Sequence, residues 1–272
     1  MSLQSELIGQ HPTEGLFFEW LKCEDTECTD KKRHRYLSER NESKEKAIET
    51  VANWLVLHHL SKNKKELLYR KQQILGKYNF EKYAESFQVF PKSDRTKKGN
   101  FGEIILTEYL SQVSGIKTLV FKLHYNPNVD QSMKGDDVLL VDEDRIIVGE
   151  SKFRSTPSKK SVEDASNSMN DELLLPISLG FIADRLFEQG QDELASKVFD
   201  IQYMMSKSTF DIRNIGFILS TKLIKNHVER NMSSTNKNFI FISLGMDNPV
   251  DFMEDAFKRA EELVMGAVSN GY

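Results

Sequence analysis

Cysteine is scarce in this chain of 272 residues, since only Cys23 and Cys28 occur. Two thiols exclude a disulfide framework, and a four-ligand zinc site would need distant histidines as well. No stretch approaches the roughly 18 consecutive apolar residues of a membrane helix. The first residues also lack the basic and then apolar segments of a secretion signal. We therefore expect a cytoplasmic protein with no membrane partner.

Apolar residues are slightly less frequent than in an average globular protein. The hydrophobic types make up 39% of the chain, and 14 glycines add to them, whereas globular proteins hold about 45 to 50% apolar residues with glycine included. The length is still sufficient for a complete hydrophobic core, in one large domain or two small ones.

Acidic residues prevail in the chain as a whole, but not in its first part. The formal net charge is −4, yet residues 31–98 contain 18 basic and 8 acidic residues. A basic stretch of this kind could contact phosphates or an acidic partner surface. The alternative is that these side chains are simply solvated on amphipathic helices, because charge asymmetry alone is weak evidence.

The first part of the chain is predicted to be helical. Apolar residues recur at three- and four-residue steps over residues 48–60 and again over 67–75, where Gly76 signals the end of the helix. Residues 23–41 are rich in charge and poor in apolar side chains. We expect a loop or an exposed arm in that segment.

The polar segment 91–99, which contains both proline and glycine, is the predicted junction. It divides the chain into a helical N-terminal region, residues 1–90, and a second region, residues 91–272, in which helices and strands alternate. The expected elements there are a helix at 101–113, strands at 118–125, 138–141 and 146–153, a helical region at 161–206, strands at 214–220 and 238–244, and a helix after Pro249. This pattern predicts an α/β fold with a mixed central sheet flanked by helices.

An acid and an amine end the apolar strand that begins at Ile146. Side chains alternate along a strand, so Glu150 and Lys152 point to the same face. Charges in such a place are costly unless they pair or perform a function. The tripeptide itself is weak evidence, because Glu42-Ser43-Lys44 repeats it in a polar helical stretch.

The strand before it supplies another acid. A hairpin turn centred on residues 143 and 144 sets Leu139 opposite Val148 and Asp137 opposite Glu150. Asp137, Glu150 and Lys152 would then converge, and Asp136 would point to the other face. A shift of one residue in the turn would exchange the two aspartates, so Asp136 remains the alternative metal ligand.

A third acid, Glu103, lies on the predicted helix 101–113, at the edge of its inward stripe. The competing explanation is that a glutamate in a first helical turn is favoured by the helix dipole alone. Clustered carboxylates suit Mg²⁺ or Mn²⁺, and a neighbouring lysine can activate water and offset charge on a phosphate. This is the chemistry of phosphodiester hydrolysis, and the order of acids and lysine resembles the PD-(D/E)xK nucleases.

Three segments together resemble a more specific family. They are Lys98-Gly-Asn-Phe-Gly-Glu-Ile104, Lys134-Gly-Asp-Asp-Val138, and Val148-Gly-Glu-Ser-Lys-Phe153 followed by Ser161-Val-Glu-Asp-Ala165. In this order and spacing they are similar to the HamA family, the nuclease subunits of Hachiman anti-phage systems.

The resemblance implies a metal-dependent DNase that acts with, and is restrained by, a helicase subunit resembling HamB. It also implies a restriction-endonuclease-like PD-(D/E)xK core. The family's catalytic acids and lysine correspond to Asp137, Glu150 and Lys152, and its helix acid corresponds to Glu103. The doubled aspartate, Asp136 and Asp137, departs from the pattern and leaves the metal ligand open between the two.

Two other functions compete with this reading. A non-catalytic adaptor could use the same fold to bind DNA or a helicase, although a retired site has no reason to keep charges at an apolar strand end. A sequence-specific restriction endonuclease would need contacts to base edges, for which we find no candidate residues. Arg154, Lys159 and Lys160 could contact the phosphates of a DNA backbone. His58 and His59 are expected in the core or at an interface. Cys23 and Cys28 are expected as free thiols.

Overall fold

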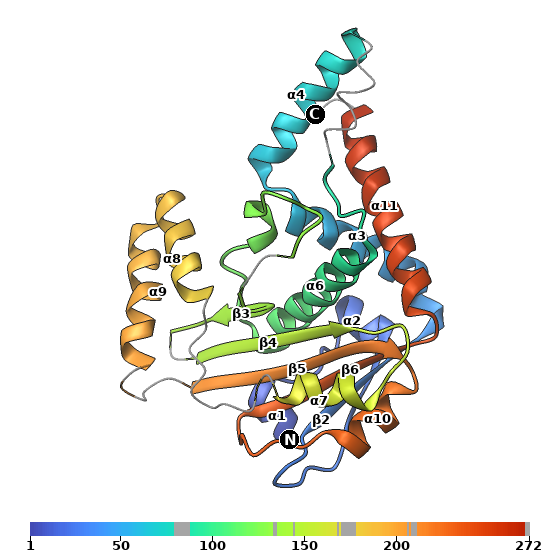
Figure 1. The fold of residues 1–272 in the computed structure, drawn as a ribbon, viewed down its shortest axis with the longest axis vertical. Coiled ribbons are helices and arrows are strands. Elements are labelled where there is room, and N and C mark those ends of the chain that lie inside the picture. The colour runs from blue at the N-terminus through green and yellow to red at the C-terminus, as the bar shows by residue number, and fades with distance from the viewer. Residues whose placement is uncertain are drawn as a thin grey trace.

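One mixed sheet organises the protein. The computed structural model describes residues 1–78, 88–132, 135–143, 145–167, 169, 178–205, 207 and 211–269. In these ranges a six-stranded sheet has the order β1-β2-β6-β5-β4-β3 (Figure 1). The strands are β1 Leu21–Asp25, β2 His34–Glu39, β3 Val138–Val141, β4 Arg145–Phe153, β5 Asp211–Thr221 and β6 Phe239–Met246.

The two edges of the sheet are antiparallel and its centre is parallel. β1 pairs with β2 and β3 pairs with β4 as antiparallel neighbours, whereas β2, β6, β5 and β4 run parallel. Every residue of β6 is buried. A parallel strand covered on both faces needs such a nearly continuous apolar run, and this run is what makes β6 central.

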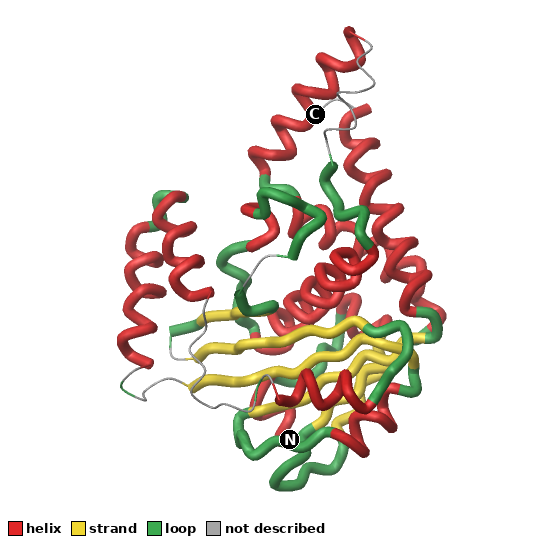
Figure 2. The backbone as a smooth tube through the Cα atoms, in the orientation of Figure 1, coloured by secondary structure: helices red, strands yellow, loops and turns green. Residues whose placement is uncertain are grey.

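Helices cover both faces of the sheet (Figure 2). One core contains residues of α3, α6 and α11 and of the short helices α1 and α2; the other contains residues of α7, α8, α9 and α10. The helices span α1 Leu3–Ile8, α2 Gly15–Trp20, α3 Lys44–His59, α4 Lys62–Tyr78, α6 Asp94–Ser114, α7 Lys159–Asn167, α8 Ser178–Glu188, α9 Asp192–Met205, α10 Ile224–Asn231 and α11 Pro249–Ser269, with 3₁₀ turns at Asn41–Ser43 (η1) and Lys122–Tyr125 (η2).

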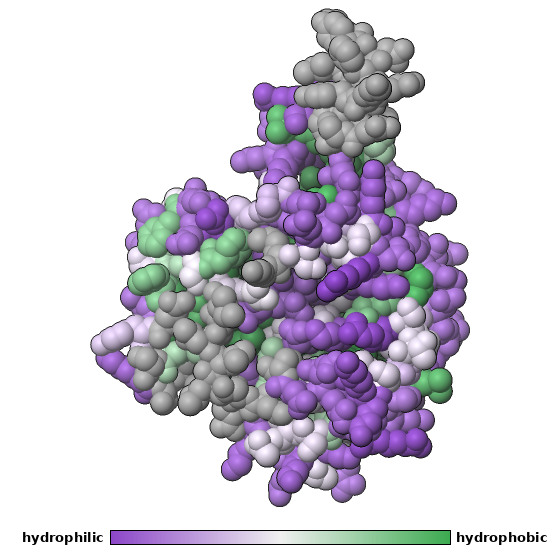
Figure 3. Space-filling view, in the orientation of Figure 1, coloured by the Kyte–Doolittle hydropathy of each residue, from purple (hydrophilic) through white to green (hydrophobic). Residues whose placement is uncertain are grey.

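Two parts stand away from the sheet. The helix α4 extends from the body, and α8 and α9 form a pair beside the end of the sheet that carries β3 (Figure 1). The visible face is mostly hydrophilic, but hydrophobic residues gather over α8 and α9 (Figure 3). Phe187, Phe199 and Tyr203 are among the exposed large hydrophobic residues. None of the helices within the described ranges is long and apolar enough to cross a membrane.

The predicted loop or exposed arm at residues 23–41 is wrong. This segment supplies most of β1 and all of β2, and β2 lies between β1 and β6 inside the sheet. Residues 1–90 are therefore not purely helical, and the sheet takes strands from both sides of Pro91. The division into two domains stays a prediction.

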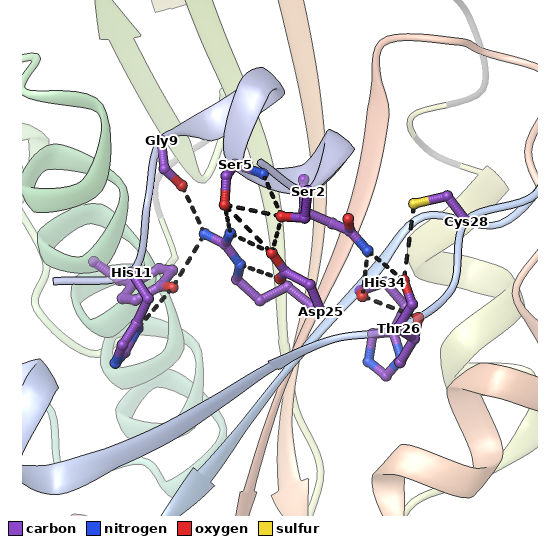
Figure 4. A network of polar contacts seen from close by, with 11 residues as sticks. Ser2, Ser5, Gly9, His11, Asp25, Thr26, Cys28 and His34 are labelled. Atoms are coloured by element: carbon purple, nitrogen blue, oxygen red, sulfur yellow. Dashed lines mark hydrogen bonds and ion pairs between the residues drawn. The ribbon is translucent and has the colours of Figure 1, made fainter.

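The charges that suggested a loop are paired inside the protein (Figure 4). Arg35 is 1% exposed, and its guanidinium donates to both carboxylate oxygens of Asp25 at 2.7 and 2.9 Å. It also donates to the hydroxyl of Ser5 and the carbonyl oxygen of Gly9. This network attaches the N-terminal segment to the sheet and allows charged residues to occupy buried strand positions.

Other boundaries differ in smaller ways. The prediction of a strand at residues 118–125 is wrong, because Lys122–Tyr125 form the 3₁₀ turn η2. Part of the predicted junction is the first turn of α6, α4 continues past Gly76, and α10 was not expected. The helix over 48–60, the four strands from β3 to β6 and the helix after Pro249 are confirmed. The helical region 161–206 contains α7, α8 and α9, with residues 168, 170–177 and 206 outside the description.

Candidate active site

The hairpin of β3 and β4 brings the first two acids together. Val141 pairs with Ile146 and Leu139 with Val148, so the predicted register is confirmed. The pairing ends at Val138, and Asp137 lies just beyond it. Its Oδ2 accepts a hydrogen bond of 2.8 Å from the backbone N–H of Ser151. Asp137 is therefore held directly beside Glu150.

Glu150 and Lys152 form an ion pair at the end of β4. Lys152 Nζ donates to Glu150 Oε1, and the two side chains are 23% and 25% exposed. Ser151 and Phe153 between and after them are buried towards α6. The alternation that the sequence predicted is present, with both charges on the face opposite α6.

Glu103 approaches Asp137 from α6. Its side chain is only 14% exposed and forms an ion pair with Lys122, with Oε2 and Nζ 2.9 Å apart. Burial raises the pKa of Glu103 to about 7, the charge of Asp137 acts in the same direction, and Lys122 opposes both.

Lys122 was missed from the sequence because the segment around it was assigned to a strand. The available signal was a single charge within Leu119-Val120-Phe121-Lys122-Leu123. Such an isolated amine in an apolar run needs a buried partner.

The charge of Asp137 acts on Glu150 as well. Burial raises the pKa of Glu150, the Asp137 carboxylate raises it further, and Lys152 lowers it. Asp137 is thus the shared neighbour of two acids that belong to different elements, α6 and β4. Among the described residues, Lys122 opposes this effect on Glu103 and Lys152 opposes it on Glu150.

Asp136 turns away from this group. Its Oδ2 accepts a 3.0 Å hydrogen bond from the N–H of Ser178, and its own N–H donates to the Ser178 hydroxyl at 2.9 Å. Both aspartates and Glu103 line a cavity of about 140 Å³, together with apolar side chains such as Phe121 and Phe181.

The donor set is suited to a hard divalent cation. Within the described residues no group of three or more His, Cys, Asp or Glu is arranged around one point. Mg²⁺ does not require such a cage, because it is usually bound by one or two carboxylates together with waters and substrate phosphates. Asp137 and Glu150 are oxygen donors of this kind, and the Asp137 carboxylate is one cause of the raised pKa of Glu150.

The remaining candidates have structural surroundings. His58 and His59 are buried as expected; His59 Nδ1 lies 2.8 Å from the carbonyl oxygen of Leu55, and His58 pairs with Glu108. Cys23 and Cys28 are free thiols, as predicted. Arg154, Lys159 and Lys160 are exposed after β4.

Comparison with known proteins gives consistent matches. A family model described as HamA matches residues 15–260. A curated relative, "Hachiman protein HamA" from Bacillus cereus, is 59% identical over 261 residues, which cover 96% of each chain.

Proposed function

This chain belongs to the HamA family of the Hachiman anti-phage defence system, and from that membership we propose that it is a metal-dependent DNA endonuclease of the PD-(D/E)xK superfamily. The mixed sheet flanked by helices agrees with such a core. The observation that carries the proposal is the place of the Asp137 carboxylate, which acts on Glu103 and on Glu150 beside Lys152.

Each charged side chain has a role in this proposal. Asp137 and Glu150 would hold Mg²⁺ or Mn²⁺, with Glu103 beside them, and the bound ion would supply Lewis acidity for attack on a phosphodiester. Lys152, which is paired with Glu150, would stabilise negative charge on a phosphate bound beside these acids. Lys122 keeps Glu103 oriented towards Asp137.

DNA is the proposed substrate, and a helicase is the proposed partner. Membership of a defence system implies a partner within that system. The resemblance to the family favours a helicase that restrains the nuclease, with the cytoplasm as the place of action. The exposed Arg154, Lys159 and Lys160 follow directly after the site, where they can contact a phosphate backbone.

The alternative is an adaptor that binds DNA or a helicase without cutting. It is less well supported, because Asp137, Glu150 and Glu103 lie close together at a cost in charge repulsion that a purely structural site does not need.

Plasmid cleavage distinguishes the two functions. The purified protein should nick or cut supercoiled plasmid with Mg²⁺ and should stop when EDTA is added. Glu150→Ala, Lys152→Ala and Asp137→Asn should each abolish cleavage while circular dichroism and melting remain parental. Glu19→Ala and Lys46→Ala, which remove an exposed ion pair, are the matched controls. A parental protein that binds DNA and does not cut it, or site variants that cut at the parental rate, would contradict the proposal.

A further inference from the structure

Asp136 and Ser178 bond to each other in both directions. The Asp136 N–H donates to Ser178 Oγ at 2.9 Å, and the Ser178 N–H donates to Asp136 Oδ2 at 3.0 Å. Ser178 is the first residue of α8, so its N–H is one of those that a helix leaves without an internal partner. The Asp136 carboxylate therefore acts as an N-terminal cap from a distant part of the chain.

The same piece of backbone is held from another side. Lys122 Nζ donates to the carbonyl oxygen of Asp136 at 3.0 Å while it pairs with Glu103. The preceding residue, Gly135, has a φ of +119°, and a Cβ there would lie 2.7 Å from Ser178 Oγ. Only glycine fits this close approach. Contacts from η2 and α8 thus fix the backbone at Asp136, and Glu103 of α6 holds the lysine of η2.

Asp137 depends on that fixation. The pairing between β3 and β4 ends at Val138 and Gly149, so Asp137 lies outside the strand ladder. Its carboxylate must nevertheless stay within reach of the Ser151 N–H and of the acids on both sides. The hydrogen bonds of the adjacent residue, Asp136, restrain the backbone at this point in place of strand pairing.

We propose that Asp136 is a positioning residue for Asp137 and not a metal ligand. Its carboxylate engages Ser178, its N–H engages the same residue and its carbonyl oxygen engages Lys122, so all three polar groups of Asp136 are used for attachment. The inference rests on the proposed function in taking Asp137 as an acid of the active site.

Two substitutions at Asp136 separate the possibilities. Asp136→Asn keeps an oxygen that accepts from the Ser178 N–H and removes the charge, whereas Asp136→Ala removes the acceptor. A positioning role predicts that the asparagine variant rescues what the alanine variant loses. Asp142→Ala is the matched control, because Asp142 follows the opposite end of β3 and its side chain is 50% exposed.

The full chain is tested with three readouts. Mn²⁺ affinity by calorimetry and plasmid cleavage should each fall about 10- to 100-fold in Asp136→Ala, as for other residues that orient a ligand, and stay near parental in Asp136→Asn and Asp142→Ala. Amide hydrogen exchange at Ser151, measured by NMR without metal, should accelerate in Asp136→Ala only. A pure capping role would accelerate exchange in α8 and leave Ser151 unchanged.

Each outcome has a defined meaning. Equal loss of Mn²⁺ affinity in Asp136→Asn and Asp136→Ala would overturn the inference, because it would make Asp136 a ligand. Parental affinity and parental Ser151 exchange in Asp136→Ala would overturn it as well. Should Asp136→Ala fail to fold, Ser178→Ala removes only one of the two bonds and is expected to show the same pattern more weakly. A parental chain that neither binds Mn²⁺ nor cleaves refutes the proposed function, while Ser151 exchange still tests the attachment of Asp137.

Discussion

Replacing Gly102 by alanine should fail to stabilise α6, although alanine is the better helix former. Gly102 faces β4, and a Cβ built on it lies 2.5 Å from Ser151 Oγ. The other nearest atoms, the Cβ atoms of Ser151 and Phe153, are 3.8 and 4.0 Å away and make ordinary contacts. The whole conflict therefore concerns one oxygen atom. Gly99 of the same helix has nothing within 4 Å of such a Cβ and is the matched control.

The magnitudes follow from these distances. Alanine for glycine inside a helix stabilises by about 1 kcal/mol, and Gly99→Ala should show that gain. Overpacking a filled interior costs about 1 to 3 kcal/mol, so Gly102→Ala should be neutral or destabilising by up to about 2 kcal/mol. Ser151 is 8% exposed and its hydroxyl makes no hydrogen bond to a described residue, so the Oγ can be removed without leaving a partner unpaired.

Urea unfolding followed by circular dichroism measures the effect. In the Ser151→Ala background, Gly102→Ala should regain the gain of about 1 kcal/mol, which gives a coupling energy of about 1 to 3 kcal/mol in the double-mutant cycle. If Gly102→Ala stabilises as much as Gly99→Ala does, or if Ser151→Ala leaves the effect unchanged, the close packing of α6 on β4 is not as described.

Two further predictions concern stability. Burial lowers the pKa of His34 to about 3 and that of His59 to about 4. As the pH falls below about 6.5, these histidines therefore take up protons in the unfolded chain before they do so in the folded protein. The free energy of unfolding should fall by roughly 1.4 kcal/mol per histidine and pH unit from about pH 6.5 down to about 4. His59→Gln should reduce that slope in urea titrations at several pH values, and an unchanged slope would contradict the assignment. Asp25→Ala leaves the buried Arg35 guanidinium without its carboxylate partner and should cost roughly 3 to 5 kcal/mol of unfolding free energy. Lys46→Ala, which breaks the exposed ion pair with Glu19, should cost roughly 0 to 1 kcal/mol. Similar losses in the two variants would refute the buried ion pair.

The hairpin of β3 and β4 could be predicted from the sequence because its information is local. The turn lies between the two strands, and alternation then determines which side chains meet. For this reason the predicted register of β3 against β4 is confirmed, and Asp137, one residue beyond it, accepts a hydrogen bond from the Ser151 N–H next to Glu150. The hydrogen bonds between Asp136 and Ser178 could not be predicted, since Ser178 lies in a different element with no periodic relation to Asp136.

The prediction of a loop at residues 23–41 was wrong because the information that decides this segment is not local. Arg35 and Asp25 make their segment resemble an exposed loop when it is read alone, and only the folded chain shows that they neutralise each other. The strand predicted at residues 118–125 was wrong for a similar reason. Its apolar residues favour a strand, but Lys122 forms an ion pair with Glu103 on α6. Long-range pairing of charges is invisible to a pattern of hydrophobicity.

The parallel pairing of β2 with β6 joins the two ends of the chain, since His34 pairs with Phe241. A ribosome synthesises β1 and β2 long before β6. The edge of β2 that pairs with β6 therefore stays unpaired during most of synthesis. Such non-local contacts have a high contact order and slow the completion of a fold. The hairpin that carries Asp137 and Glu150 likewise receives its parallel neighbour, β5, only after α7, α8 and α9 have been made. A nascent chain that ends before β5 therefore lacks the parallel strand that pairs with β4 along its whole length in the finished molecule.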